Sequence, residues 1–201
     1  MQNDYFWICP NDQKKDSWIF YEIRKRKLVK NAYCQSISCE KCGKFDELLA
    51  LNSIDKFSMS INASSDYCLT GDGIVLVSSR LRNLIISAFP SESTFIEHHA
   101  LNDFSVCIPN QSFDVDAATC DMQFHRKCGA CGRYRETSGF PVVSAELGSG
   151  LTLPNMIFEN IRGRVFFYAC SERFKTAIEK LKIRGIYFNA VLTQPDHGRL
   201  K

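Results

Sequence analysis

The sequence predicts an α+β protein built from two related halves. Three observations lead to this prediction: a composition typical of globular chains, a C-x-x-C-G segment that occurs twice, and a strand–helix–strand pattern after each copy. The chain has 201 residues, of which 45% are hydrophobic and 23% are charged. These fractions are ordinary for a folded domain and supply enough apolar side chains for a sizeable core.

The N-terminal region, Tyr5–Val29, predicts a meander of short strands. Two aromatic runs, at residues 6–8 and 18–21, flank the polar turn Asn11–Asp16. The basic run that follows, Arg24–Lys27, is interpreted as a solvated strand end or turn.

Two seven-residue segments share one pattern, C-x-x-C-G-basic-aromatic. They are residues 39–45, CEKCGKF, and residues 128–134, CGACGRY. Glu47 and Glu136 extend the match two places further. A C-x-x-C turn followed by glycine wraps two thiolates around one metal ion, because glycine relieves the backbone where amides point toward the sulfurs. We call these segments knuckle 1 and knuckle 2.

Four thiolates from two knuckles would form a closed tetrahedral site. The sequence therefore predicts one structural Zn²⁺ on Cys39, Cys42, Cys128 and Cys131. The knuckles lie 89 positions apart (128 − 39), far more than in a common zinc ribbon. Loop-closure entropy grows only logarithmically with length, so folded structure can fill the gap. Two unrelated surface pairs, or one redox pair beside a structural pair, are the alternatives.

A strand–helix–strand pattern follows each knuckle, over residues 74–98 and 165–191. Aligning Arg80 with Arg173 gives an offset of 93 (173 − 80), at which Phe95 also falls on Phe188. In both segments apolar residues recur with the spacing of one helical face. An N-cap serine is expected before each helix, either Ser78 or Ser79 in the first segment and Ser171 in the second. The core-facing residues are predicted to be Leu81, Leu84 and Ile85 in the first helix, and Phe174, Ala177 and Ile178 in the second.

The domain organisation follows from these repeats. We expect residues 1–201 to form a single zinc-stapled domain with an internal repeat over approximately 30–105 and 120–195. The region Ser138–Asn155 contains several glycines and prolines and is expected to be mostly loop.

The layout resembles the double-CXXCG motif proteins of bacteria. The resemblance lies in the two knuckles and in a closing segment that starts at Ser171-Glu172-Arg173-Phe174 and continues through Gly185 to Phe188. Members with an assigned role are immunity proteins, made beside a polymorphic toxin that they neutralise in the cytoplasm. The resemblance implies that this chain binds a cognate, co-encoded toxin.

Composition also bears on location and partners. The first 18 residues lack a basic start followed by an apolar segment, so no signal peptide is expected, and no run is apolar enough for a membrane span. Ten cysteines without an export signal indicate a reducing cytoplasm. The net charge of +3 is weak for a nucleic-acid partner. The oligomeric state is not predicted.

The sequence also bears on two other functional classes, enzymes and nucleic-acid-binding proteins. No catalytic constellation is recognisable and a four-cysteine zinc keeps no open position, so we expect no enzyme. His125 lies three residues before Cys128 and could replace a thiolate, although a polar strand residue is the simpler interpretation. The adjacent residues His98 and His99 are expected on opposite faces of a strand, so they would not act as a pair. A zinc-ribbon-type nucleic-acid-binding or regulatory protein is the alternative function, because basic residues surround both knuckles and Phe45 and Tyr134 could stack on bases.

Overall fold

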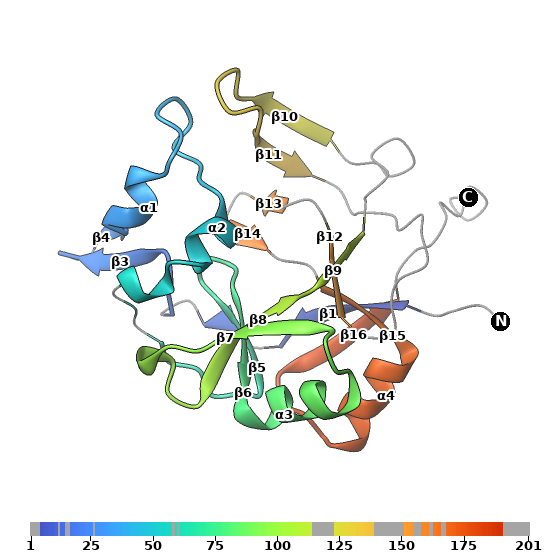
Figure 1. The fold of residues 1–201 in the computed structure, drawn as a ribbon. Helices are drawn as coiled ribbons and strands as arrows, with labels where there is room; N and C mark the ends of the chain where they lie inside the picture. The colour runs from blue at the N-terminus through green and yellow to red at the C-terminus, as the bar shows by residue number, and fades with distance from the viewer. Residues whose placement is uncertain are drawn as a thin grey trace, which may run out of the picture.

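Two five-stranded sheets form the body of the protein, whose structure is a computed structural model (Figure 1). The structure describes residues 5–11, 13, 14, 17–25, 27–57, 59, 61–113, 123–138, 151–154, 158–160, 163–165 and 168–190. Within these residues the fold is α+β, as predicted, with small sheets and short helices.

The first sheet has the strand order β2-β5-β6-β8-β7. Its strands, in that order, are β2 (Gln13–Lys14), β5 (Tyr67–Thr70), β6 (Val75–Ser78), β8 (Phe104–Pro109) and β7 (Ser93–Ile96). The edge strand β2 runs parallel to β5, and the other neighbours are antiparallel. All four residues of β5 and three of the four in β6 are buried, so both faces of the sheet are covered there.

The second sheet has the order β16-β1-β15-β12-β9. Its strands are β16 (Ile186–Ala190), β1 (Tyr5–Pro10), β15 (Tyr168–Ser171), β12 (Leu151–Pro154) and β9 (Gln111–Phe113). Here too one edge strand, β9, runs parallel to its neighbour, and the remaining pairs are antiparallel.

Three antiparallel hairpins form separate two-stranded sheets. They are β3–β4 (Tyr21–Arg24, Lys27–Lys30), β10–β11 (Gln123–Lys127, Tyr134–Ser138) and β13–β14 (Phe158–Asn160, Gly163–Val165). The predicted N-terminal meander is wrong, because β1, β2 and β3 belong to three different sheets. In the region expected to be loop, residues 151–154 form β12, while residues 139–150 lie outside the described residues.

Four α-helices and two 3-10 helices are present among the described residues. They are α1 (Ala32–Ser36), α2 (Glu47–Leu51), α3 (Ser79–Ala88), α4 (Glu172–Lys180), η1 (Ile54–Lys56) and η2 (His99–Leu101). None of these helices combines the length and apolar character needed to cross a bilayer.

The predicted strand–helix–strand order is observed twice, as β6-α3-β7 and β15-α4-β16. Ser78 and Ser171 cap the two helices, accepting hydrogen bonds from the amides three residues on at 3.3 and 3.2 Å. The predicted core faces are confirmed: Leu81, Ile85, Phe174 and Ile178 are buried, and Leu84 and Ala177 pack against the core. That the halves arose by duplication stays a prediction.

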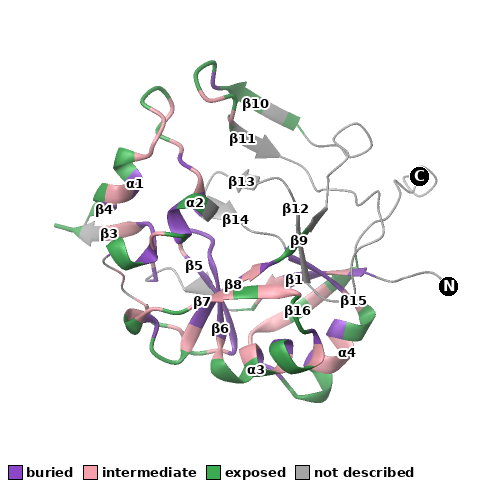
Figure 2. Cartoon of the chain, in the orientation of Figure 1, coloured by how far each residue is buried: buried purple, intermediate pink, exposed green. Residues whose placement is uncertain are grey.

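The core reaches from the sheets to knuckle 1 (Figure 2). The buried ring of Phe45 meets Phe20 edge-on at 5.2 Å, and Phe20 meets Phe57 in the same way at 5.9 Å. The buried carboxylate of Asp72 fixes this cluster by accepting hydrogen bonds from the amides of Ile19 and Phe20, at 2.8 and 2.6 Å. Knuckle 1 is therefore anchored to the core through its last residue.

Candidate metal centre

Knuckle 1 lies between α1 and α2 and closes through two backbone hydrogen bonds. The amide of Gly43 donates to the carbonyl of Cys39 at 2.7 Å, and the amide of Cys39 donates to the carbonyl of Lys44 at 2.7 Å. Gly43 has φ +73°, a left-handed conformation that glycine adopts without a steric penalty. The turn therefore requires the glycine that follows the second cysteine.

Knuckle 2 forms the tip of the β10–β11 hairpin and repeats this geometry. Gly132 donates to the carbonyl of Cys128 at 2.8 Å, and Cys128 donates to the carbonyl of Arg133 at 2.8 Å. Gly132 also has φ +73°. The two segments that match in sequence therefore match in backbone conformation.

The structure brings the four predicted cysteines together. The sulfurs of Cys39, Cys42, Cys128 and Cys131 all lie within 4.8 Å of one another. Across the knuckles, Cys39 Sγ lies 3.9 Å from Cys128 Sγ, and Cys42 Sγ lies 3.5 Å from Cys131 Sγ. A tetrahedral zinc with bonds of about 2.3 Å would place its sulfurs about 3.8 Å apart. The cluster therefore has the dimensions to hold one metal ion.

Backbone amides make part of this cluster acidic. Hydrogen bonds from the amides of Cys131 and Ala130 lower the pKa of the Cys128 thiol to about 6. The amides of Cys42 and Lys41 likewise lower the pKa of the Cys39 thiol.

The thiol of Cys42 behaves differently. The amide of Lys44 lowers its pKa, but desolvation and the neighbouring thiols together raise it to about 11. Cys128 is therefore the more readily ionised of these thiols, whereas the ionisation of Cys42 requires a cation that offsets the repulsion from the neighbouring sulfurs.

Hydrogen bonds and an ion pair join the two knuckles beside the sulfurs. Lys44 Nζ donates to the carbonyl of Tyr134 at 2.7 Å, and the guanidinium of Arg133 lies 3.4 Å from the carboxylate of Asp46. On the knuckle 1 side alone, Lys30 Nζ donates to the carbonyl of Gly43 and, at 2.9 Å, to Ser38 Oγ. Basic residues near the knuckles therefore make structural contacts.

The two aromatic residues that follow the knuckles have different environments. Phe45 is 2% exposed and belongs to the core, whereas Tyr134 is 37% exposed with Lys127 Nζ 5.5 Å from its ring centroid. Of the two rings considered for base stacking, only that of Tyr134 is accessible.

Comparison of the sequence with protein-family models and with curated proteins finds no match.

The other candidate ligands do not join the cluster. His125 lies in β10 opposite Glu136, and among the described residues the four knuckle cysteines are the only group of three or more potential ligands close enough to share a metal ion. Of the repeated glutamates, Glu47 is buried at the start of α2.

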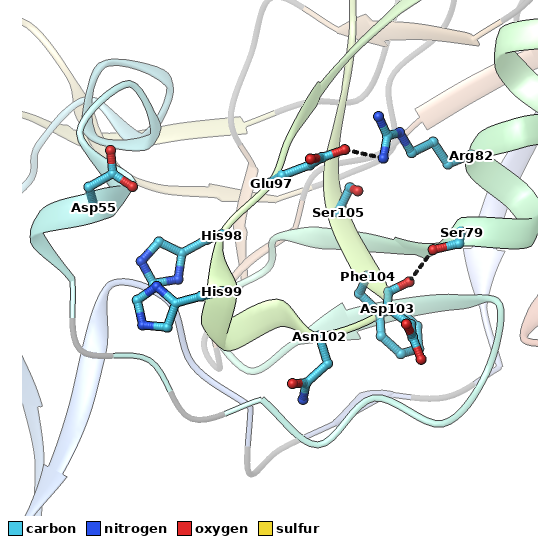
Figure 3. Close-up of a pocket in the computed structure, with 10 residues that line it drawn as sticks. All are labelled: Asp55, Ser79, Arg82, Glu97, His98, His99, Asn102, Asp103, Phe104 and Ser105. Atoms are coloured by element: carbon cyan, nitrogen blue, oxygen red, sulfur yellow. Dashed lines mark hydrogen bonds and ion pairs between the residues drawn. The ribbon is translucent and has the colours of Figure 1, made fainter.

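A separate polar cavity of ≈ 530 Å³ was not anticipated from the sequence (Figure 3). The rings of His98 and His99 lie together in it, with centroids 4.0 Å apart, and Arg82 forms an ion pair with Glu97. The expectation that the histidines face opposite sides is wrong, because β7 ends at Ile96 and η2 begins at His99. Desolvation and then the proximity of His99 lower the pKa of His98, which keeps it neutral at neutral pH. The remaining lining residues are Asp55, Ser79, Asn102, Asp103, Phe104 and Ser105.

Proposed function

We propose that this chain is a zinc-binding immunity protein that neutralises a cognate bacterial toxin by direct protein–protein binding. The observation that supports the proposal is the convergence of both C-x-x-C-G knuckles on one four-sulfur cluster. This cluster fits the double-CXXCG pattern of the family that the sequence resembles, whose members with an assigned role are immunity proteins.

Zinc is the ion that the proposal assigns to the cluster. Cys39, Cys42, Cys128 and Cys131 would hold it as thiolates, and sulfur ligands at tetrahedral spacing favour Zn²⁺ or iron over the harder cations. With four protein ligands the ion keeps no position for water or substrate, so its role is structural and the protein is not an enzyme. The ion fixes the two knuckles relative to each other.

Binding is then the activity, and the toxin is the partner. Thiolate ligands and free thiols at the other described cysteines suit the reducing cytoplasm, where an immunity protein must intercept its toxin. The net charge of +3 argues against inhibition by phosphate mimicry, which would require an acidic face.

The direct test is co-expression with the toxin encoded next to this gene. Cells that carry the toxin should survive only when this chain is present, and an affinity tag on the chain should recover the toxin in a salt-resistant complex. Cys42→Ser combined with Cys131→Ser should reduce protection, while Cys9→Ser, which alters a cysteine outside the cluster, should leave it intact. Full toxicity in the presence of abundant, folded wild-type chain would refute the immunity proposal.

Nucleic-acid binding is the second candidate, and one observation favours it. Tyr134 presents an accessible ring beside Lys127 at the tip of knuckle 2. Under this alternative, affinity for labelled RNA or DNA should fall steeply with salt, and Lys44→Ala and Arg133→Ala should reduce the slope. Binding that is absent at low salt would eliminate it.

A further inference from the structure

We infer that the chain is an intramolecular pseudo-dimer: its two halves exchange their first strands, and the metal centre lies on the pseudo-two-fold axis that relates them. The N-terminal half comprises residues 5–96 and the C-terminal half residues 104–190. This inference goes beyond the proposed function and does not depend on the identity of the metal or of the partner.

The two sheets are equivalent strand by strand. The order β2-β5-β6-β8-β7 in the first corresponds to β9-β12-β15-β1-β16 in the second. In each sheet the first two strands of this order are parallel and the next three pairs are antiparallel. In each, a helix connects the third strand to the fifth, and the strand between them is antiparallel to both.

That intervening strand always comes from the other half. β1 opens the N-terminal half but lies between β15 and β16, and β8 opens the C-terminal half but lies between β6 and β7. The next strands, β2 and β9, each join the sheet of their own half. The exchange is therefore reciprocal.

The exchanged strands also share their register. Tyr5 lies opposite Ser171, and Phe104 lies opposite Ser78; both serines are helix N-caps. An asparagine follows each exchanged strand directly. The amide of Asn11, after β1, donates to the carbonyl of Gly185, just before β16, at 2.9 Å. The amide of Asn110, after β8, donates to the carbonyl of Glu92, just before β7, also at 2.9 Å. Since Gly185 and Glu92 differ by the offset of 93, these bonds are equivalent.

The helices make a second pair of equivalent contacts. Arg80, in the first turn of α3, donates to the carbonyl of Leu181 at the end of α4. Arg173, in the first turn of α4, donates at 3.4 Å to the carbonyl of Ala88 at the end of α3. Both donors and both acceptors differ by 93 positions, so each contact is the image of the other.

At the metal centre, equivalent residues face each other directly. Cys39 lies against Cys128 and Cys42 against Cys131, and both pairs are 89 positions apart. A residue meets its own equivalent only at a two-fold axis, as in an isologous dimer interface. The knuckles lie at one end of the molecule and the pair α3–α4 at the other, so the axis runs between these ends (Figure 1).

One consequence distinguishes this architecture from two self-contained halves stapled by a metal. Each sheet contains a central strand of the other half, so backbone hydrogen bonds hold the halves together even without the ion. Two autonomous halves joined by the metal would instead separate once the metal is removed.

The test is to cut the chain between the halves. A protease recognition sequence inserted between Asn102 and Asp103, two exposed residues that precede β8, allows cleavage of the full-length folded protein. We expect the two fragments to remain a one-to-one complex by native mass spectrometry, before and after chelation of the metal, and to separate only in denaturant. Separation in native buffer upon chelation would overturn the inference.

Hydrogen exchange of the uncut, metal-free protein provides an independent measurement if the insertion impairs folding. The amides of β1 and β8 should be protected as strongly as those of β6 and β15, while the amides of the two knuckles should exchange rapidly once the metal is removed. Rapid exchange throughout β1 and β8 would contradict strand exchange. Neither readout involves the toxin, so failure here is distinguishable from failure of the immunity proposal.

Discussion

Replacing two neighbouring isoleucines of α3 tests how the helix is buried. Ile85 is 1% exposed and Ile86 is 48% exposed, although they are identical residues in consecutive positions. Ile85→Ala deletes three buried carbons, worth about 2.4 kcal/mol at about 0.8 kcal/mol each, and also leaves a cavity. The expected loss of unfolding free energy is therefore roughly 2–5 kcal/mol.

Ile86→Ala is the matched control. Because the Ile86 side chain is about half exposed, its truncation removes only about half as much buried apolar surface and leaves no cavity. The expected loss of unfolding free energy is therefore about 1 kcal/mol or less. The gain in helix propensity is the same at both positions and cancels in the comparison. Urea denaturation of the metal-loaded proteins measures both losses, with unchanged m-values confirming a common mechanism. Equal losses at the two positions would refute the assigned burial.

Three further perturbations probe the charge, the backbone and the metal. Burial raises the pKa of the Asp72 carboxyl above its ordinary 3.8 despite its hydrogen bonds, so its contribution to stability is greatest at acid pH and is lost as pH rises through the raised pKa. Asp72→Asn, which can still accept from the Ile19 and Phe20 amides, should therefore gain stability relative to wild type as pH rises above about 4, and a pH-independent difference in urea denaturation would contradict this. A Cβ on Gly185, which has φ +92°, would lie 2.4 Å from the Tyr67 carbonyl oxygen, whereas Gly132 has φ +73° and open space around it. Gly185→Ala should therefore lower the melting temperature clearly more than Gly132→Ala, whose cost is about 1–2 kcal/mol, and the reverse order would count against this packing. Stripping the metal with a strong chelator should lower the melting temperature, and re-addition of Zn²⁺ should restore it; an unchanged melting temperature would mean that metal binding is not coupled to folding.

Local signals in the sequence predicted the parts of the fold that local chemistry determines. The knuckles need a glycine at the left-handed position, and both helices need a serine cap and a regularly spaced apolar face. These requirements are met within a few residues, so Cys39, Cys128 and Ser171 could be placed from the sequence alone. For the first helix the sequence left Ser78 and Ser79 as alternatives, and the structure shows Ser78 as the cap. The convergence of the knuckles was predictable because four thiolates complete one site.

Strand partners were not predictable, because an apolar run indicates a strand but not its neighbour. β1 pairs with β15 and β16, more than 150 residues away, and this long-range pairing overrode the expected local meander. β12 lies in a region whose glycines and prolines indicated a loop. The adjacent rings of His98 and His99 depend on where β7 ends, which alternation along a strand cannot specify.

X-ray absorption at the zinc edge of the purified, full-length protein, combined with elemental analysis, tests the central claim most directly. The account predicts one zinc per chain with four sulfur neighbours at about 2.3 Å, and loss of this shell when Cys39 and Cys128 are both replaced by serine. A protein that purifies folded without metal, or one whose zinc has nitrogen or oxygen neighbours in place of sulfur, would contradict it.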